Sequence, residues 1–284
     1  MTALLDTHQH LIYPEVAGYG WTDDIPPLAN KAFTVDTYRD LSIDAEIVGS
    51  LFMEAGVDDT DYQEETRYVA KLAGNADSGI LGIIASCRPE ETAGFAQWLD
   101  ECDDLGVLGY RRILHVVDDS MSQSNTFRRN VREIGSRGKT FDMCFLPKQL
   151  PVALELAQSC DNTRLILNHC GVPDIAGGGL DPWRGDIRAL ATLANVSCKL
   201  SGLLAYCAPG EANLKAIQPY VDHVLEEFGP ERIVWGSDWP VVELANGLPD
   251  WIDVTQQILA QLSTGEASDI GSNNAARIYD VSLN

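Results

Sequence analysis

Basic residues are scarce in this sequence. Its 284 residues include 20 lysines and arginines against 42 aspartates and glutamates, which gives a formal charge of −22. A surface that acidic repels phosphate backbones and anionic lipid, so we expect binding neither to nucleic acid nor to a membrane. No apolar run approaches the roughly 20 residues that a membrane span needs. Residues 1–6 lack the basic and apolar regions of a secretion signal, which predicts a cytoplasmic protein.

Two common cofactor and cross-link patterns are also missing. The seven cysteines are odd in number and include no Cys-x-x-Cys pair, which is typical of free thiols in a reducing compartment. No Gly-x-Gly-x-x-Gly follows any predicted strand, which argues against a dinucleotide-binding sheet. We therefore expect a soluble protein that binds a small molecule or converts it as an enzyme.

What the sequence does contain is a regular alternation of apolar strands and amphipathic helices. The predicted strands are 4–10, 45–54, 80–87, 108–115, 140–146, 164–169, 196–201 and 232–238. The predicted helices are 34–42, 58–74, 89–104, 126–136, 150–159, 181–193, 214–228, 249–262 and 266–279. Eight such units in a chain that is 45% hydrophobic predict one domain, residues 1–284, folded as a closed (β/α)₈ barrel. An open doubly wound sheet is the alternative.

Most histidines and several charged residues fall where these strands end. His8 and His10 share one face at the end of the first strand. The residues at the other strand ends are Glu54, Arg111, Arg112, His115, His169, Lys199, Ser201 and Asp238. In a (β/α)₈ barrel the active site lies at the C-terminal ends of the strands, so these side chains are expected to converge.

Each of these residues also has a structural interpretation. Asp238 could stabilise a turn, His169 could be a buried core histidine, Glu54 could cap a helix, and Lys199 could extend to solvent. The fifth histidine, His223, lies in a predicted helix and is expected at the surface. The joint placement at one end of the barrel favours a functional site. The loop 12–33 is long, and its aromatic residues, Trp21 among them, predict a packed cover over that site.

Several segments resemble the amidohydrolase superfamily, in the lactonase-rich branch that includes sugar-acid lactonases and 2-pyrone-4,6-dicarboxylate lactonase. The matching segments are Asp6-Thr7-His8-Gln9-His10, Glu65-Thr66, Gly109-Tyr110-Arg111, Leu167-Asn168-His169-Cys170-Gly171-Val172-Pro173, Cys198-Lys199-Leu200-Ser201-Gly202-Leu203, Trp235-Gly236-Ser237-Asp238-Trp239-Pro240-Val241 and Asn274-Ala275-Ala276-Arg277-Ile278-Tyr279. They extend over the whole chain. The resemblance implies a (β/α)₈ barrel that hydrolyses a lactone.

The resemblance also implies roles for individual residues. Asp238 is the expected general base that activates water. His8, His10 and His169 are expected to polarise the carbonyl, directly or through a metal. Substrate contacts are expected from Arg111, Lys199, His115 and Trp21.

The sequence departs from the superfamily pattern in its metal ligands. Two-metal members use a lysine on the fourth strand and a histidine on the fifth, whereas here the fourth strand carries arginines and the fifth, residues 140–146, has no histidine. One divalent ion on His8, His10 and Asp238 is the alternative, with Glu54 or His169 as a fourth ligand. Zinc suits such nitrogen and oxygen ligands, while metal-free hydrolysis stays equally open.

The sequence-based hypothesis is therefore lactone hydrolysis by water activated at Asp238, with a sugar-acid lactone favoured over a dicarboxylate. Two other functions stay open. One is a mononuclear metal-dependent amidohydrolase or decarboxylase, and the other is a non-catalytic barrel that binds a small molecule. The oligomeric state is open too, with a homo-oligomer among the alternatives.

Overall fold

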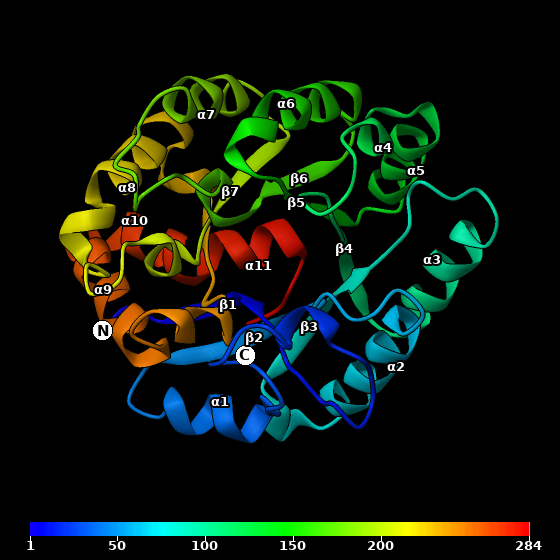
Figure 1. Ribbon diagram of the computed structural model, residues 1–284, viewed down its shortest axis with the longest axis horizontal. Helices are drawn as coiled ribbons and strands as arrows, with labels where there is room; N and C mark the ends of the chain where they lie inside the picture. The colour runs from blue at the N-terminus through cyan, green and yellow to red at the C-terminus, as the bar shows by residue number, and fades with distance from the viewer. Residues whose placement is uncertain (284) are drawn as a thin grey trace.

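The computed structural model describes residues 1–283, which form a barrel of parallel strands surrounded by helices (Figure 1). The strands are β1 (Leu4–Gln9), β2 (Ile47–Met53), β3 (Ile80–Ser86), β4 (Val107–Ile113), β5 (Thr140–Cys144), β6 (Arg164–Leu167), β7 (Val196–Leu200) and β8 (Ile233–Trp235). The helices are α1 (Val35–Leu41), α2 (Tyr62–Ala73), α3 (Phe95–Asp104), α4 (Ser120–Gln123), α5 (Asn125–Ser136), α6 (Leu150–Ser159), α7 (Trp183–Ala191), α8 (Leu214–Phe228), α9 (Leu248–Leu259), α10 (Thr264–Ser268) and α11 (Asn274–Tyr279). The strand order β1 to β8 follows the chain and confirms the predicted (β/α)₈ topology.

The barrel closes where the residues after β8 meet β1. The amide of Asp238 donates to the carbonyl of His8 at 2.9 Å, and the amide of His10 donates to the carbonyl of Trp239 at 2.8 Å. Asp6 strengthens this seam, because its Oδ1 accepts from the amides of both Ser237 (2.8 Å) and His8 (3.0 Å). Backbone hydrogen bonds of the seam thus join the two ends of the chain at the predicted site.

Two apolar layers hold the barrel together. The larger layer lies between strands and helices, as expected for strands that are buried on both faces. The smaller one fills the inside of the barrel with inward side chains of β1, β2, β3, β6 and β8 and of α11. Its fully buried members include Leu5, Leu51, Ile84, Ile166 and Val234. Figure 1 looks along the barrel and shows α11 lying across it. The inside of the barrel is therefore a packed core beneath any site at the strand ends.

Some predicted helix boundaries were wrong. The helix expected over 89–104 begins at Phe95, because turns precede it and Gly94 adopts a left-handed backbone with φ of 79°. The segment 266–279 is not one helix but α10, a π-helical turn at Asp269–Asn273, and α11. The short helix α4 was not predicted.

His223 is another correction. It was expected at the surface, but only 5% of it is exposed. It lies on α8, where its Nε2 donates to the carbonyl of Arg184 at 2.9 Å and its ring packs against Trp183. His223 is therefore a satisfied core histidine between α7 and α8, away from the strand ends.

The long loop 12–33 is folded over the barrel. Ile12 and Phe33 form an antiparallel bridge at its base, and Tyr13, Tyr19 and Leu28 are buried within it. The loop therefore packs as predicted for a cover. Over residues 1–283, none of the helices combines the length and the apolar character that crossing a membrane requires.

The seam predicts a specific stability effect for Asp6→Ala. The substitution removes the acceptor of two buried amides and of the Tyr38 hydroxyl, which donates to Asp6 Oδ2 at 2.7 Å. We expect the free energy of unfolding in urea to fall by about 3 kcal/mol, and by only about 1 kcal/mol in the control Tyr38→Phe. Equal losses in the two variants would show that the seam amides do not depend on Asp6.

Candidate active site

His8, His10 and Asp238 meet at the seam, at the C-terminal end of the barrel. Asp238 Oδ1 lies 3.7 Å from His8 Nε2 and 3.5 Å from His10 Nε2. All three residues are at least 95% buried, with exposures of 0%, 5% and 2%. The structure thus brings two histidines together with an aspartate that follows them by about 230 positions.

The two histidines face Asp238 with their Nε2 atoms. His10 Nδ1 donates to the carbonyl of Met53 at 2.9 Å, so Nδ1 carries a proton and Nε2 is the nitrogen that faces Asp238. On His8, Nε2 lies 3.2 Å from Arg111 Nη1, which can only donate, so this nitrogen is an acceptor too. Two imidazole nitrogens and one carboxylate oxygen therefore converge around a point that favours a positive charge or a donating water.

Arg111 supplies a fixed positive charge beside His8. Its Nε donates to Glu54 Oε1 and its Nη2 to the Glu54 carbonyl, both at 2.6 Å. Glu54 Oε2 accepts from the amide of Gly56, so Glu54 neither caps a helix nor reaches the site as a metal ligand. Burial would raise the pKa of Glu54, but Arg111 outweighs it and holds the pKa below its ordinary value. The buried ion pair orients the guanidinium toward His8.

Burial and neighbouring cations keep His8 in its neutral form. Burial is the largest cause that lowers its pKa, followed by the positive charges of Lys199 and other neighbours. Burial acts in the opposite direction on Asp238, but His169, His10 and Arg111 together hold the pKa of Asp238 below its ordinary value. The site therefore combines an ionised carboxylate with a neutral imidazole at neutral pH.

His169 completes the cluster from the end of β6. Its ring lies 4.5 Å from that of His8, and its Nδ1 is 2.9 Å from Ser201 Oγ and 3.8 Å from Asp238 Oδ2. Burial lowers the pKa of His169 to about 4, although Asp238 opposes the shift. The ring of Tyr206, on the turn after β7, lies edge-on to that of His169 with 6.2 Å between the ring centres.

Backbone conformation places these side chains as much as strand position does. His169 and Asp238 have left-handed backbones, with φ of 52° and 58°, which few non-glycine residues adopt and which cluster at functional sites. Gly202 packs against both: a Cβ at this position would come within 2.6 Å of Asp238 Oδ2 and 2.9 Å of His169 Nδ1. The turn after β7 therefore needs glycine to approach the site so closely.

The other predicted site residues lie elsewhere. Lys199 was expected to bind substrate, but it is fully buried beneath the site and pairs with Asp142. Arg112 pairs with Glu90 on the outer side of β4. His115 is exposed on the loop after β4, with Nδ1 3.2 Å from the thiol of Cys144.

Trp21, the remaining predicted substrate contact, is 38% exposed on the covering loop. Its Nε1 donates to the carbonyl of Ala55, directly after Glu54. The loop thus reaches the rim of the site. Trp21 lies beside the end of β2, where Glu54 binds Arg111.

Sequence reasoning overlooked Asp142 and the partner of Arg111. A charged residue in the middle of the apolar strand β5 was an available signal for Asp142, because buried carboxylates need partners. The pairing of Glu54 with Arg111 had no such signal, because it depends on how β2 and β4 are spaced around the barrel.

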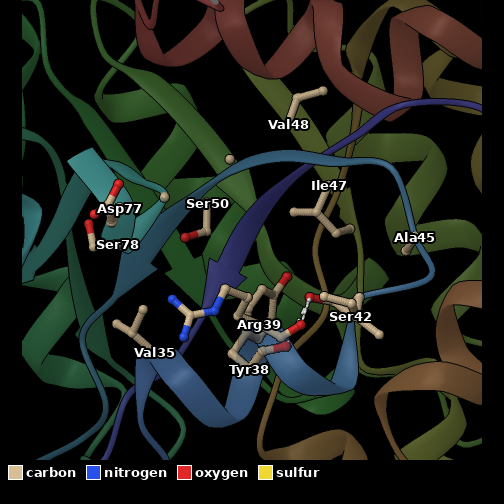
Figure 2. Close-up of a pocket in the computed structure, with 13 residues that line it drawn as sticks. Val35, Tyr38, Arg39, Ser42, Ala45, Ile47, Val48, Ser50, Asp77 and Ser78 are labelled. Atoms are coloured by element: carbon tan, nitrogen blue, oxygen red, sulfur yellow. Dashed lines mark hydrogen bonds between the residues drawn. The ribbon is translucent and has the colours of Figure 1, made fainter. Parts of the chain in front are cut away.

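A separate groove lies at the opposite end of β2. It has a volume of about 300 Å³ and is lined by α1, the first residues of β2 and the turn at Asp77 and Ser78 (Figure 2). Glu54 follows the other end of the same strand, so this groove is distinct from the cluster of His8, His10 and Asp238.

Comparisons with known proteins identify the family of this chain. Residues 5–281 match the sequence model of a protein family described as Amidohydrolase. The chain belongs to this amidohydrolase family. An L-fucono-1,5-lactonase of Burkholderia ambifaria is 29% identical to it, over 99% of this chain and 97% of the relative. A 4-sulfomuconolactone hydrolase of Rhizobium radiobacter is 30% identical over 58% of this chain and 53% of the relative.

A solved structure shows the same architecture. The crystal structure of an amidohydrolase from Burkholderia multivorans with bound zinc has a TM-score of 0.89 and 26% identity, covering 99% of this chain and all of that one. This likeness, together with the match over residues 5–281, places the chain among hydrolases built on a (β/α)₈ barrel.

The donor set of this amidohydrolase fits one divalent ion. Ligand atoms about 2.0–2.1 Å from a tetrahedral zinc lie about 3.3 Å from one another. The separations of 3.5 and 3.7 Å from Asp238 Oδ1 to the two Nε2 atoms are close to that value. The bond from His10 Nδ1 to the carbonyl of Met53 is the outer contact that ligating histidines make. Arg111 competes for the lone pair of His8.

His169 predicts a loss of stability in acid. Because its pKa is about 4 in the folded protein and 6.5 in the reference state, its contribution is complete above pH 6.5 and is lost as the pH falls toward 4. The test variant is His169→Asn, because asparagine tolerates a left-handed backbone. Between pH 7 and pH 4 its free energy of unfolding should fall by about 3 kcal/mol less than that of the wild type. Urea unfolding at both pH values measures it.

Ser201→Ala serves as the control, because it removes the partner of His169 Nδ1 but keeps the titrating ring. It should retain most of the wild-type pH dependence. If His169→Asn loses as much stability in acid as the wild type, His169 does not carry this dependence.

Proposed function

We propose that this amidohydrolase hydrolyses a lactone and that Asp238 is its general base. The observation that supports the proposal is the convergence of Asp238 Oδ1 with the Nε2 atoms of His8 and His10 in a buried cluster. A binding protein has no use for an ionised carboxylate held in a buried histidine cluster, whereas water activation needs such a group. The full-length relative named as a lactonase supports the same reaction class.

In the proposed reaction, Asp238 accepts a proton from water as the water oxygen attacks the lactone carbonyl carbon. The carbonyl π electrons move to oxygen, which the fixed positive charge of Arg111 and the neighbouring imidazoles stabilise. Collapse of the tetrahedral intermediate breaks the ring C–O bond. The proton held by Asp238 passes to the departing ring oxygen, which leaves a hydroxy acid. The left-handed backbones at Asp238 and His169 direct the carboxylate of the first and the imidazole of the second toward the site.

A divalent ion has a natural place in this proposal. His8, His10 and Asp238 would hold it, and it would supply Lewis acidity toward the carbonyl and acidify a bound water. The zinc found in the Burkholderia multivorans structure supports zinc as the first ion to test.

The substrate we propose is a neutral sugar-acid lactone. Each strand-end cation that could hold a carboxylated substrate is already paired with a carboxylate of the protein. Arg111 lies 2.6 Å from Glu54, Arg112 2.8 Å from Glu90 and Lys199 2.7 Å from Asp142. With a formal charge of −22 on the whole chain, an anionic substrate would meet repulsion without a free counter-charge.

Asp238→Asn tests the role of the base. Asparagine keeps the size and tolerates the left-handed backbone, so the variant should fold while kcat/KM falls by about 10³-fold. The assay is acid release from an aldonolactone, corrected for spontaneous hydrolysis. Asp186→Asn, on helix α7, is the matched control and should keep wild-type rates. Full turnover by Asp238→Asn would rule out the mechanism.

A panel of lactones tests the substrate class. Neutral five- and six-membered aldonolactones should be hydrolysed at least about 10²-fold better in kcat/KM than carboxylated or sulfonated lactones of the same ring size, which corresponds to about 2.7 kcal/mol. Running the panel with and without a chelator, and after adding zinc back, decides whether the ion takes part. Preference for a carboxylated lactone would overturn the substrate assignment while leaving lactone hydrolysis intact.

A further inference from the structure

Directly beneath the site lies an ion pair that the proposed reaction does not use. Lys199 Nζ, on β7, is 2.7 Å from Asp142 Oδ1, on β5, and neither residue has any exposed surface. Taking two charges out of water is unfavourable, and apolar side chains of similar volume often serve stability as well or better. The nearby inside of the barrel is filled by such residues, among them Ile84, Ile166 and Val234. Stability alone therefore does not account for the pair.

Two contacts of the pair lead to the residues that precede two site histidines, and a third joins Asp142 Oδ2 to the hydroxyl of Tyr279, on α11, at 3.2 Å. Lys199 Nζ also donates to the carbonyl of Thr7 at 2.8 Å, and Thr7 is followed by His8. Asp142 Oδ1 also accepts from Asn168 Nδ2 at 2.7 Å, and Asn168 is followed by His169. One buried pair is thus bonded to β1 and to the end of β6, immediately below both imidazoles.

The segment after Asn168 is one that needs restraint. His169 and Cys170 both have a φ of 52°, a left-handed conformation that costs a non-glycine residue about 1–3 kcal/mol. The side chain of Asn168 is anchored on Asp142, and the thiol of Cys170 lies 3.5 Å from the carbonyl of Lys199. The side chain of Asp142 therefore holds this strained turn at Asn168, and the backbone of Lys199 holds it at Cys170.

We propose that Lys199 and Asp142 are positioning residues of the active site. The pair fixes the peptide of Thr7 and the side chain of Asn168, and so sets where the rings of His8 and His169 lie relative to Asp238. Neither residue touches the substrate. The kinetic part of this inference rests on the proposed lactone hydrolysis, whereas the placement of the rings can be observed without any substrate.

The main test uses the double variant Lys199→Met/Asp142→Asn, which removes both charges together and leaves no buried charge unpaired. We expect kcat on the best aldonolactone of the panel to fall at least 10-fold, with KM within about threefold of the wild type. We also expect the ¹⁵N and ¹H ring signals of His8 and His169 to shift in NMR spectra. Unchanged kcat together with unchanged ring signals would show that the pair only stabilises the fold.

The matched control is Asn274→Ala at the opposite end of β8, where Asn274 Nδ2 donates to the carbonyls of Pro230 and Ile233. It loses buried hydrogen bonds without touching the site, so it should lower the thermal midpoint while keeping kcat and the histidine signals. A comparable fall in kcat in this control would assign the effect to general destabilisation and overturn the proposal.

A single variant keeps the test decisive if the double variant does not fold. Asn168→Ala leaves the ion pair intact and removes only the hydrogen bond from Asn168 to Asp142, next to His169. It should shift the ring signals of His169, leave those of His8 in place, and lower kcat. If both rings stay unshifted, positioning through Asn168 is refuted. If the wild type hydrolyses none of the lactones, the proposed function fails, while the ring signals still decide whether the pair places the histidines.

Discussion

The seam between the two ends of the chain is the constraint on which the site depends. Two backbone hydrogen bonds, from Asp238 to His8 and from His10 to Trp239, close the barrel with the same residues that form the cluster. Asp6 adds a side-chain bridge from β1 to Ser237, next to Asp238. Closing the fold and assembling the site are therefore one event, and any change that loosens the seam acts on both.

Two neutral ion pairs are buried at the strand ends, in contrast to the acidic surface. Glu54 with Arg111 and Asp142 with Lys199 each join a carboxylate on one strand to a cation on another. The first pair faces His8 directly, and the second lies one layer lower. Such pairs hold positive ends near the imidazoles without leaving a net charge to attract an anion. In the proposed reaction, such pairs would favour a developing oxyanion while giving a fully charged substrate little counter-charge to bind.

The sequence predicts the fold well because strand and helix periodicities are strong and regular along this chain. The meeting of His8, His10 and Asp238 follows from the same logic, since all three lie at strand ends. How deeply a side chain is buried, and which residue it pairs with, are harder to predict. Alternation correctly places Lys199 on the same face as Ser201, yet the pattern carries no information on how far below the opening that residue lies.

Other features depend on geometry that no short pattern encodes. The left-handed backbones of His169 and Asp238 are imposed by surrounding contacts, such as the close approach of Gly202. Burial of His223 depends on how α7 and α8 pack, because its partner is the carbonyl of Arg184. The pairing of Glu54 with Arg111 likewise appears only once β2 and β4 are fixed in the barrel.

The position of the seam has a consequence for synthesis on the ribosome. His8 leaves the exit tunnel long before Asp238 and Trp239, which cap the free edge of β1 and are translated about 230 residues later. At about 5–20 residues per second, that edge stays open for about 10–50 s. An exposed strand edge readily pairs with other chains, so the nascent polypeptide is open to wrong pairing at β1 until the residues after β8 are made.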